Sequence, residues 1–294
     1  LVIVHDAIGV NMIDTYVRKG LYPVDLPSGL GGEAAGIITA VGGDVAALEP
    51  GMRVAYVTPP PFDAYSEARV VDARWVVPLP AELDSATAAA VLLKGLTSWF
   101  LLHRSYRVAV GDWLLIYAAA GGVGSLLVQW AVQLGARVIG VVGSESKREI
   151  AAAHGCHHVL LASDDVVGRV RALTDGAGVA AVYDSVGRDT FMASLDCLAP
   201  HGVMVSYGNA SGPVEPVAPL ELMRRGSLFL TRPSLYDFIN DRGLLETGAR
   251  ELFAMVLAGT LRVDINQRFA LKDAADAHRA LESRQTTGAT VLEP

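Results

Sequence analysis

The sequence contains few cysteines and no excess of positive charge. Only two of its 294 residues are cysteines, Cys156 and Cys197, so it cannot form a framework of disulfide bonds. This scarcity favours a reducing compartment, and we expect a cytoplasmic protein. The 31 acidic residues outnumber the 24 basic ones and give a formal net charge of −7, which argues against a general nucleic-acid-binding protein.

Long apolar runs and a leader sequence are also missing. The longest apolar candidate, residues 88–102, is interrupted by Lys94 and Gly95 and is shorter than the roughly 20 residues of a membrane-spanning helix. No basic segment precedes an apolar one at the N-terminus, so the sequence predicts neither a membrane anchor nor a signal peptide. Because the chain starts at Leu1, inside a strand-like run, we expect a preceding segment of the protein to be missing.

Apolar residues, by contrast, are plentiful. Hydrophobic residues make up 51% of the chain and charged residues 19%, which is enough apolar material for large buried cores. This composition excludes an intrinsically disordered chain. The length of 294 residues suggests two domains.

One stretch, residues 113–147, organises the rest of the sequence. Residues 113–117 form an unbroken apolar run, which is typical of a central parallel strand covered on both faces. Ala119, Gly121 and Gly124 follow with the spacing A-x-G-x-x-G, a variant of the dinucleotide-binding fingerprint. Gly121 lets the backbone approach a pyrophosphate, and Gly124 lets the next helix pack closely on the strand. A helix and a second apolar strand at 137–142 complete the unit, whose helix N-terminus is suited to hold the pyrophosphate.

The end of the second strand indicates which dinucleotide binds. A site that prefers NAD holds the ribose 2′-hydroxyl with an Asp or Glu at this point. Here Gly143 and Ser144 follow the strand, and Lys147 and Arg148 lie just beyond, so a hydroxyl group and two cations favour the 2′-phosphate of NADPH. Glu145 is close enough to argue for NAD, but it lies past the end of the strand. The alternative interpretation is that no nucleotide binds. Residues 113–147 are then an ordinary βαβ unit with a glycine turn, and Lys147 and Arg148 are solvated charges.

The remaining sequence divides into a β-rich part and an alternating part. Short strand-like segments with Gly and Pro between them fill the first part and predict a barrel-like β domain; they lie at 1–10, 34–41, 53–58 and 65–71, with a short helix or turn at 11–19. Residues 86–104 are helical. Strands and helices then alternate, which predicts a parallel, doubly wound sheet. Its expected strands are 113–117, 137–142, 158–161, 181–184, 203–207 and 228–231. The tail, with helices at 235–258 and 272–283 and strands at 262–269 and 289–292, is expected to return to the first domain.

Several motifs together resemble one protein family. They are AIGVNMIDTY at 7–16, LPSGLGGEAAG at 26–36, KGLT at 94–97, AAAGGVG at 118–124, YDSVGRDT at 183–190 and TRPSL at 231–235. In combination they resemble the NADPH-dependent quinone oxidoreductases, zinc-free members of the medium-chain dehydrogenase/reductase superfamily that include the zeta-crystallin type. The resemblance runs over the whole chain, and it implies that the segment expected before Leu1 corresponds to roughly the first thirty residues of the family's β domain.

The resemblance implies the α/β fold class, with a doubly wound parallel Rossmann sheet plus a GroES-like β-barrel domain. The GroES-like catalytic domain is expected at 1–92 and 236–294, and the Rossmann dinucleotide-binding domain at 93–235. The resemblance also implies a cleft between the domains and a homodimer paired through the Rossmann sheets. The implied reaction is two-electron reduction of a quinone, or a related conjugated carbonyl, by NADPH.

The resemblance carries functional residues over by position. Asn11 and Tyr16 are expected to line the cleft near the nicotinamide, and Gly122, Val123 and Gly124 to hold the pyrophosphate. Further positions implied to touch the cofactor are Gly143, Ser144 and Lys147 at the 2′-phosphate, Val186 on the adenosine side, Tyr207, Gly208 and Asn209 at the nicotinamide ribose, Arg232 and Arg284 in late motifs, and Lys94, Thr97 and Phe100 on the facing helix. One departure is Ala162, at the place where the family often has a Tyr beside the 2′-phosphate; it weakens the expectation of NADPH without reversing it.

Zinc is not expected. Zinc-dependent relatives have a Cys and a His where this chain has Asn11 and Gly32, and the remaining Glu33 alone is not a metal site. His154, Cys156, His157 and His158 are the one dense group of possible ligands. Their spacing fits the end of a helix that runs into a strand, so we interpret them as structural, and we interpret Cys197 as a core residue.

The mechanism and the function leave alternatives open. Charge that develops on the acceptor oxygen must be stabilised by hydrogen bonds, with Asn11, Tyr16 and water as candidates. Tyr16 is a possible proton donor, a residue that lines the cleft, or an aromatic residue that closes a turn. Three functions stay in view: a quinone reductase, an NADPH-dependent reductase of α,β-unsaturated ketones or aldehydes, and a non-catalytic, crystallin-like protein that binds NADPH or RNA. The acidic balance argues weakly against RNA.

Overall fold

The computed structural model describes residues 1–294 as two compact units. The discontinuous unit comprises Leu1–Leu96 and Leu235–Pro294, and the continuous unit comprises Thr97–Ser234. The sequence placed the first division after residue 92, but helix α2 (Ser85–Phe100) passes through both positions without interruption. A helix that crosses a division leaves no turn signal in the sequence, so the boundary could not be located from residue types.

A seven-stranded sheet forms the frame of the discontinuous unit. Its strand order is β12-β13-β1-β2-β3-β5, with β4 paired to β1. The strands are β1 (Val2–Val10), β2 (Glu33–Ala40), β3 (Arg53–Val57), β4 (Ala68–Val70), β5 (Val76–Pro78), β12 (Ile265–Ala270) and β13 (Ala289–Glu293). The last strand runs antiparallel to the first, with Ile8 opposite Leu292, which confirms that the tail returns to the first domain. Strand β5 was not expected, and β4 and β12 are shorter than expected.

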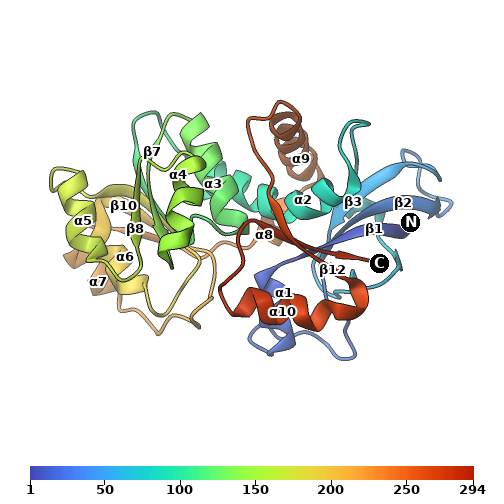
Figure 1. Ribbon diagram of the computed structural model, residues 1–294, viewed down its shortest axis with the longest axis horizontal. Coiled ribbons are helices and arrows are strands. Elements are labelled where there is room, and N and C mark those ends of the chain that lie inside the picture. Colours follow the sequence, from blue (N-terminus) through green and yellow to red (C-terminus); the bar gives the residue numbers. More distant parts are fainter. The chain divides into compact units, whose positions relative to one another are not determined.

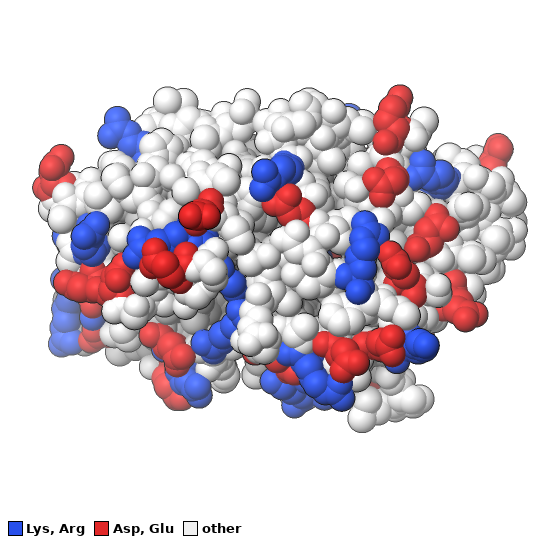
Figure 2. Space-filling view, in the orientation of Figure 1, with Lys and Arg blue, Asp and Glu red and all other residues white.

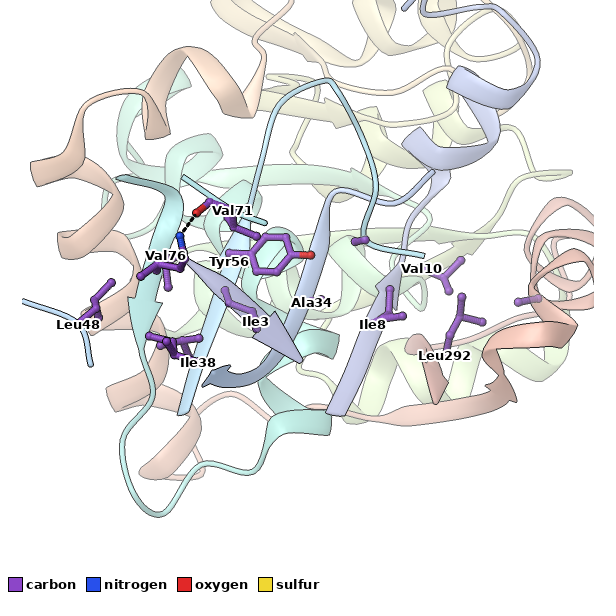
Figure 3. Packing of buried hydrophobic residues seen from close by; sticks show 14 residues of the cluster. Ile3, Ile8, Val10, Ala34, Ile38, Leu48, Tyr56, Val71, Val76 and Leu292 are labelled. Carbon is purple, nitrogen blue, oxygen red and sulfur yellow. Dashed lines mark hydrogen bonds between the residues drawn. The ribbon is translucent and has the colours of Figure 1, made fainter. Parts of the chain in front are cut away.

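The core of this sheet draws on segments from both ends of the chain. Figure 3 shows Ile3, Ile8 and Val10 of β1 together with Tyr56 of β3 and Leu292 of β13. All five side chains are at most 1% exposed. Side chains alternate across a strand, so Ile3 and Ile8, which are five residues apart, share the core because the register of β1 on β2 shifts between His5 and Ala7.

The helices of the discontinuous unit differ from the sequence expectation in one place. They are α1 (Met12–Arg18), α8 (Leu235–Ile239), α9 (Arg242–Leu257) and α10 (Ala274–Glu282), besides α2. The single helix expected at 235–258 is wrong, because the chain breaks at residues 240–241. Asp241 caps α9 by accepting a hydrogen bond from the backbone N–H of Leu244 at 3.1 Å. A side-chain cap of this kind starts a new helix.

The continuous unit contains a six-stranded parallel sheet. Its order is β11-β10-β9-β6-β7-β8, formed by β6 (Trp113–Tyr117), β7 (Arg137–Val142), β8 (His158–Leu161), β9 (Val179–Asp184), β10 (Leu198–Ser206) and β11 (Phe229–Thr231). Figure 1 shows its strands between α3 (Gly122–Gln133) and α4 (Arg148–Ala153) on one side and α5 (Val166–Leu173), α6 (Phe191–Cys197) and α7 (Pro219–Arg224) on the other. The strand order reverses between β6 and β9, which confirms the doubly wound sheet. Ligands of such sheets bind at the carboxyl ends of the strands beside this reversal.

Helix α2 continues through a π-helical turn, Leu101–Ser105. Together they make one segment of 21 residues, Ser85–Ser105, that is long and apolar enough to cross a membrane by length and composition. An apolar stretch of 18 residues within this segment is 78% buried inside the protein, as is common for the core helix of a globular fold.

Candidate active site

The turn after β6 is shaped by two glycines. Gly121 is the N-cap of α3 and donates its N–H to the carbonyl oxygen of Ala118 at 2.8 Å. A Cβ atom on Gly124 would lie 2.1 Å from the same oxygen, so no larger residue fits without a backbone shift. Helix α3 therefore starts in close contact with the turn, as the glycine spacing predicts.

The start of α3 presents backbone donors. The first i→i−4 bond of the helix runs from the N–H of Ser125 to the carbonyl oxygen of Gly121 at 2.8 Å. The N–H groups of Gly122, Val123 and Gly124 come before it and have no partner within the helix. Donors of this kind, at the positive end of the helix dipole, suit the phosphate groups of a dinucleotide. The chain's own residues therefore fit such a cofactor.

The loop after β7 carries the residues expected at the 2′-phosphate. Ser144 follows Gly143, and its hydroxyl lies 3.0 Å from that of Ser146. Burial lowers the pKa of Lys147, which is half-buried. Arg148 differs from the expectation, because its guanidinium donates to the Glu145 carboxylate and to the carbonyl oxygen of Val159, both at 2.9 Å. These bonds give Arg148 and Glu145 a structural role, so neither indicates the choice of dinucleotide.

Asp184, at the end of β9, holds the next turn. Its buried carboxylate accepts the N–H groups of Val186 at 2.7 Å and Gly187 at 3.1 Å, and the hydroxyls of Thr190 at 2.7 Å and Ser194 at 3.0 Å. Burial raises the pKa of Asp184, while the four hydrogen bonds act in the opposite direction. The carboxylate thereby fixes the turn that carries Val186.

The turns after β9 and β10 pack against each other. The backbone N–H of Ser211 donates to the carbonyl oxygen of Val186 at 2.8 Å. A Cβ on Gly208 would lie 2.4 Å from the carbonyl oxygen of Ser185. Because parallel strands end at one edge, the structure brings these predicted residues together at the carboxyl edge of the sheet: Gly122, Val123, Gly124, Gly143, Ser144, Lys147, Val186, Tyr207, Gly208, Asn209 and Arg232.

Other predicted residues lie elsewhere. Thr97 and Phe100 are buried positions of α2 within the continuous unit. Asn11, Tyr16, Lys94 and Arg284 belong to the discontinuous unit. Arg284 is exposed and has the left-handed backbone angle φ of 60°.

In the discontinuous unit, two buried carboxylates hold Asn11. Its backbone N–H donates to Oδ2 of Asp14 at 2.8 Å, and its side-chain Nδ2 donates to Oε2 of Glu33 at 2.9 Å. Asn11 is the N-cap of α1, and Asp14 occupies the third position of that helix. An acidic residue at this position is a recognised cap for the N-terminal N–H groups. The orientation of the Asn11 carboxamide is therefore fixed by Glu33.

Glu33 belongs to a buried ion pair. Its Oε2 lies 3.6 Å from Nζ of Lys94, and the two side chains are 0% and 6% exposed. Its Oε1 accepts the backbone N–H of Leu93 at 2.5 Å. Burial raises the pKa of Glu33, and the Lys94 charge opposes that increase. Gly9 makes room for the carboxylate, since a Cβ there would lie 2.2 Å from Oε2 of Glu33.

Asp14 and Tyr16 follow Asn11 on the same short helix. Asp14 is 2% exposed, and burial raises its pKa to about 7. Tyr16 is 8% exposed, with its ring in an edge-to-face contact with Tyr22 at 5.3 Å. The carbonyl oxygen of Tyr16 accepts the N–H of Leu21 at 2.9 Å, so its backbone closes the end of the helix. A carboxyl group whose pKa lies near neutrality and a phenol thus follow Asn11 by three and five residues on α1.

The contributions of Glu33 and Asp184 do not follow from the motifs in the sequence. Glu33 resembles the carboxylate of a zinc site that is otherwise absent, and no sequence pattern marks its burial beside Lys94. Asp184 directly precedes the S-V-G turn, and an Asp before a turn was a usable signal, because its side chain often accepts N–H groups two and three residues ahead. Within residues 1–294, no three His, Cys, Asp or Glu side chains are grouped so that they could hold a metal ion. Zinc-free chemistry stays a prediction.

Comparisons with known proteins match both units. Residues 1–81 match the family model described as the alcohol dehydrogenase GroES-like domain, and residues 122–242 match the one described as zinc-binding dehydrogenase. The chain is 49% identical to a quinone oxidoreductase of Pseudomonas aeruginosa over 98% of its own length and 89% of that protein. It is 43% identical to a 2-haloacrylate reductase of Burkholderia, over 98% and 89% of the two chains.

A solved structure agrees with these matches. The crystal structure of the Escherichia coli quinone oxidoreductase complexed with NADPH superposes with a TM-score of 0.97 at 45% identity, covering 100% of this chain and 91% of that one. Three findings lead to one assignment. They are the two units of the expected kind, the glycine-rich turn at the carboxyl edge of the parallel sheet, and the similarities to known proteins. The chain belongs to the NADPH-dependent quinone oxidoreductases of the medium-chain dehydrogenase/reductase superfamily.

Proposed function

We propose that this chain is an NADPH:quinone oxidoreductase that transfers hydride without zinc. The observation that carries the proposal is the strand–turn–helix unit with donors at Gly122, Val123 and Gly124, in a chain 49% identical to a quinone oxidoreductase. When bound, NADPH supplies the hydride. The protein's residues bind and orient the cofactor and the acceptor. The proposed location is the cytoplasm, as the scarcity of cysteine favours.

The cofactor is proposed to lie along the carboxyl edge of the six-stranded sheet. The amides of Gly122–Gly124 hold the pyrophosphate, and Ser144 and Lys147 hold the 2′-phosphate. Val186 lies on the adenosine side, and Tyr207–Asn209 on the side of the nicotinamide ribose. The roles assigned to Lys94, Thr97, Phe100, Arg232 and Arg284 are proposed from the resemblance alone.

Steady-state oxidation of NADPH and NADH with 1,4-benzoquinone tests this function. We expect rapid turnover with NADPH and little with NADH. Replacing Lys147 by alanine removes a charge-assisted hydrogen bond to the 2′-phosphate and is expected to raise KM for NADPH roughly tenfold or more, with little change for NADH. Arg148→Ala is the matched control, because the Arg148 guanidinium is bound to Glu145 and the carbonyl oxygen of Val159. Tight NADPH binding without quinone turnover would contradict the proposal.

Asn11 and Tyr16 are proposed to stabilise the charge that develops on the acceptor oxygen. Tyr16→Phe removes one hydroxyl, and we expect kcat to fall about tenfold or more while the affinity for NADPH is retained. The affinity is measured by fluorescence titration and kcat with saturating 1,4-benzoquinone. Unchanged turnover would leave Tyr16 as an aromatic residue that closes the turn.

A second candidate function is reduction of a conjugated carbonyl or acrylate. The 43% identity to a 2-haloacrylate reductase favours it, and the same hydride donor would serve. RNA binding has less support: Figure 2 shows acidic and basic side chains intermixed on the visible face. Parallel assays with quinones and enones separate the first two functions, and filter binding across salt concentrations tests the third.

A homodimer paired through β11 is also proposed. This strand is an edge of the six-stranded sheet, with Phe229 61% and Leu230 41% exposed, and Met223 of α7 is 59% exposed. An apolar edge strand is suited to pair with a second copy. We expect Phe229→Lys to convert a dimer to a monomer in light scattering. Val110→Lys, at an isolated residue that is 85% exposed, is the control and should leave the mass unchanged.

A further inference from the structure

A chain of hydrogen bonds connects Asp14 with helix α10. The Tyr65 hydroxyl lies 3.1 Å from Oδ2 of Asp14 and 2.9 Å from Nε2 of His278. On its other side, Nδ1 of His278 lies 3.0 Å from the NH1 nitrogen of Arg18. Arg18 is also bound to Glu282 at 2.7 Å, on a partly exposed surface. The chain thus joins α1 to α10 over 260 residues of sequence.

Each hydrogen bond in this chain has a defined direction. A guanidinium only donates, so Nδ1 of His278 must accept and the imidazole proton must be on Nε2. Nε2 then donates to the Tyr65 oxygen, which leaves the single Tyr65 proton for Oδ2 of Asp14. The same Oδ2 accepts the backbone N–H of Asn11 at 2.8 Å. All donors therefore point toward Asp14, an arrangement that favours its carboxylate form.

The donor-to-acceptor direction of these hydrogen bonds also excludes proton transfer as their role. To pass a proton to Asp14, His278 would have to receive another at Nδ1, and Arg18 cannot release one. This series of hydrogen bonds therefore holds the Asp14 carboxylate in place and does not conduct protons. We infer that Tyr65 and His278 are positioning residues that hold the Asp14 carboxylate, and through it the backbone N–H of Asn11, for the reduction of the acceptor. This inference rests on the proposed function for its kinetic consequences only.

Asp14 has charged and titratable neighbours on several elements. Glu33 on β2 opposes its ionisation and Lys94 on α2 favours it. Tyr65 donates to it, and Tyr236 on α8 is close enough for its own ionisation to be opposed by Asp14. Because burial raises the pKa of Asp14 to about 7, loss of one donor changes its protonation in the neutral range. A positioning role therefore predicts a pH effect that simple loss of packing does not.

Four variants test the inference. Tyr65→Phe removes the side-chain donor to Asp14 and keeps the backbone donor of Asn11. We expect kcat/KM for 1,4-benzoquinone at pH 7 to fall about tenfold, with the acid limb of its pH profile moving upward by roughly one pH unit. His278→Leu should behave alike. In His278→Gln the carboxamide can accept from Arg18 and donate to Tyr65, so activity should be retained to within about threefold. Tyr56→Phe removes another buried phenol, bound to His5 at 2.9 Å, and should change neither quantity.

A second readout does not depend on turnover. The infrared band of the protonated Asp14 carboxyl group, assigned by its loss in Asp14→Asn, is titrated in protein without cofactor. Tyr65→Phe should move its midpoint upward, and Tyr56→Phe should not. An unmoved midpoint in Tyr65→Phe, or a His278→Gln variant as inactive as His278→Leu, overturns the inference. If the wild type does not reduce quinones, the proposed function fails, and the infrared titration still decides the positioning role.

Discussion

Replacing Glu33 by alanine is expected to lower the free energy of unfolding by about 3–5 kcal/mol. The Glu33 carboxylate is fully buried and neutralises Lys94, whose side chain is only 6% exposed. Its removal leaves an uncompensated charge inside the discontinuous unit. It also leaves the N–H of Leu93 and the carboxamide of Asn11 without their acceptor. Activity should fall as well, because Asn11 is no longer oriented.

Urea unfolding, followed by circular dichroism, measures this loss. Glu33→Gln keeps an acceptor for Leu93 but removes the charge, so the double variant Glu33→Gln with Lys94→Met should recover part of the stability. Glu145→Ala is the control, since the Glu145 side chain is 75% exposed and its pair with Arg148 is expected to contribute less than about 1 kcal/mol. A Glu33→Ala protein as stable as the wild type would show that the buried pair does not support the fold.

Gly124→Val is expected to abolish measurable NADPH binding. The new side chain would meet the carbonyl oxygen and carbon of Ala118 at 2.1 and 2.8 Å, and these are backbone atoms that cannot rotate away. Helix α3 must shift, and its N–H donors then leave the position suited to the pyrophosphate. Overpacking of this kind also costs about 1–3 kcal/mol of stability.

Isothermal titration with NADPH tests this effect, and Gly121→Ala provides a graded comparison. A Cβ on Gly121 would lie 3.1 Å from the Ala118 oxygen, so a small displacement relieves the contact. We expect weaker binding in Gly121→Ala and none in Gly124→Val. Equal affinities in the two variants would show that the close approach of α3 to the turn does not determine binding. Gly43→Ala, where a Cβ meets no atom within 4 Å, should bind as the wild type does.

The parallel sheet could be predicted closely from the sequence. The bounds 113–117, 137–142 and 158–161 agree with β6, β7 and β8. Strands buried on both faces are continuous apolar runs between turn residues, so their ends are marked in the sequence. Strand β5, Val76–Pro78, has only three residues and no such pattern. Its pairing with β3 depends on tertiary contacts, which residue types alone do not specify.

The candidate site was predictable only where its residues are neighbours in sequence. The turn with Gly121 and Gly124 is a local motif, and its geometry follows from the absence of Cβ atoms. Tyr65 and His278, by contrast, lie 213 residues apart. Neither has a spacing that marks the other as its partner. The same holds for Lys94 and Glu33, whose burial depends on the packing of a helix from one segment on a strand from another.

The position of the last strand affects how the protein is made. Strand β13 lies between β12 and β1, so it fills an interior place in its sheet. During synthesis on the ribosome, residues 97–234 emerge as a complete unit while this sheet still lacks two strands. The edge of β1 around Ile8 is apolar and stays unpaired until Val291 and Leu292 of β13 have been synthesised. Domains fold as units during translation, so we expect the segment in the middle of the chain to fold first and the segments at its two ends last.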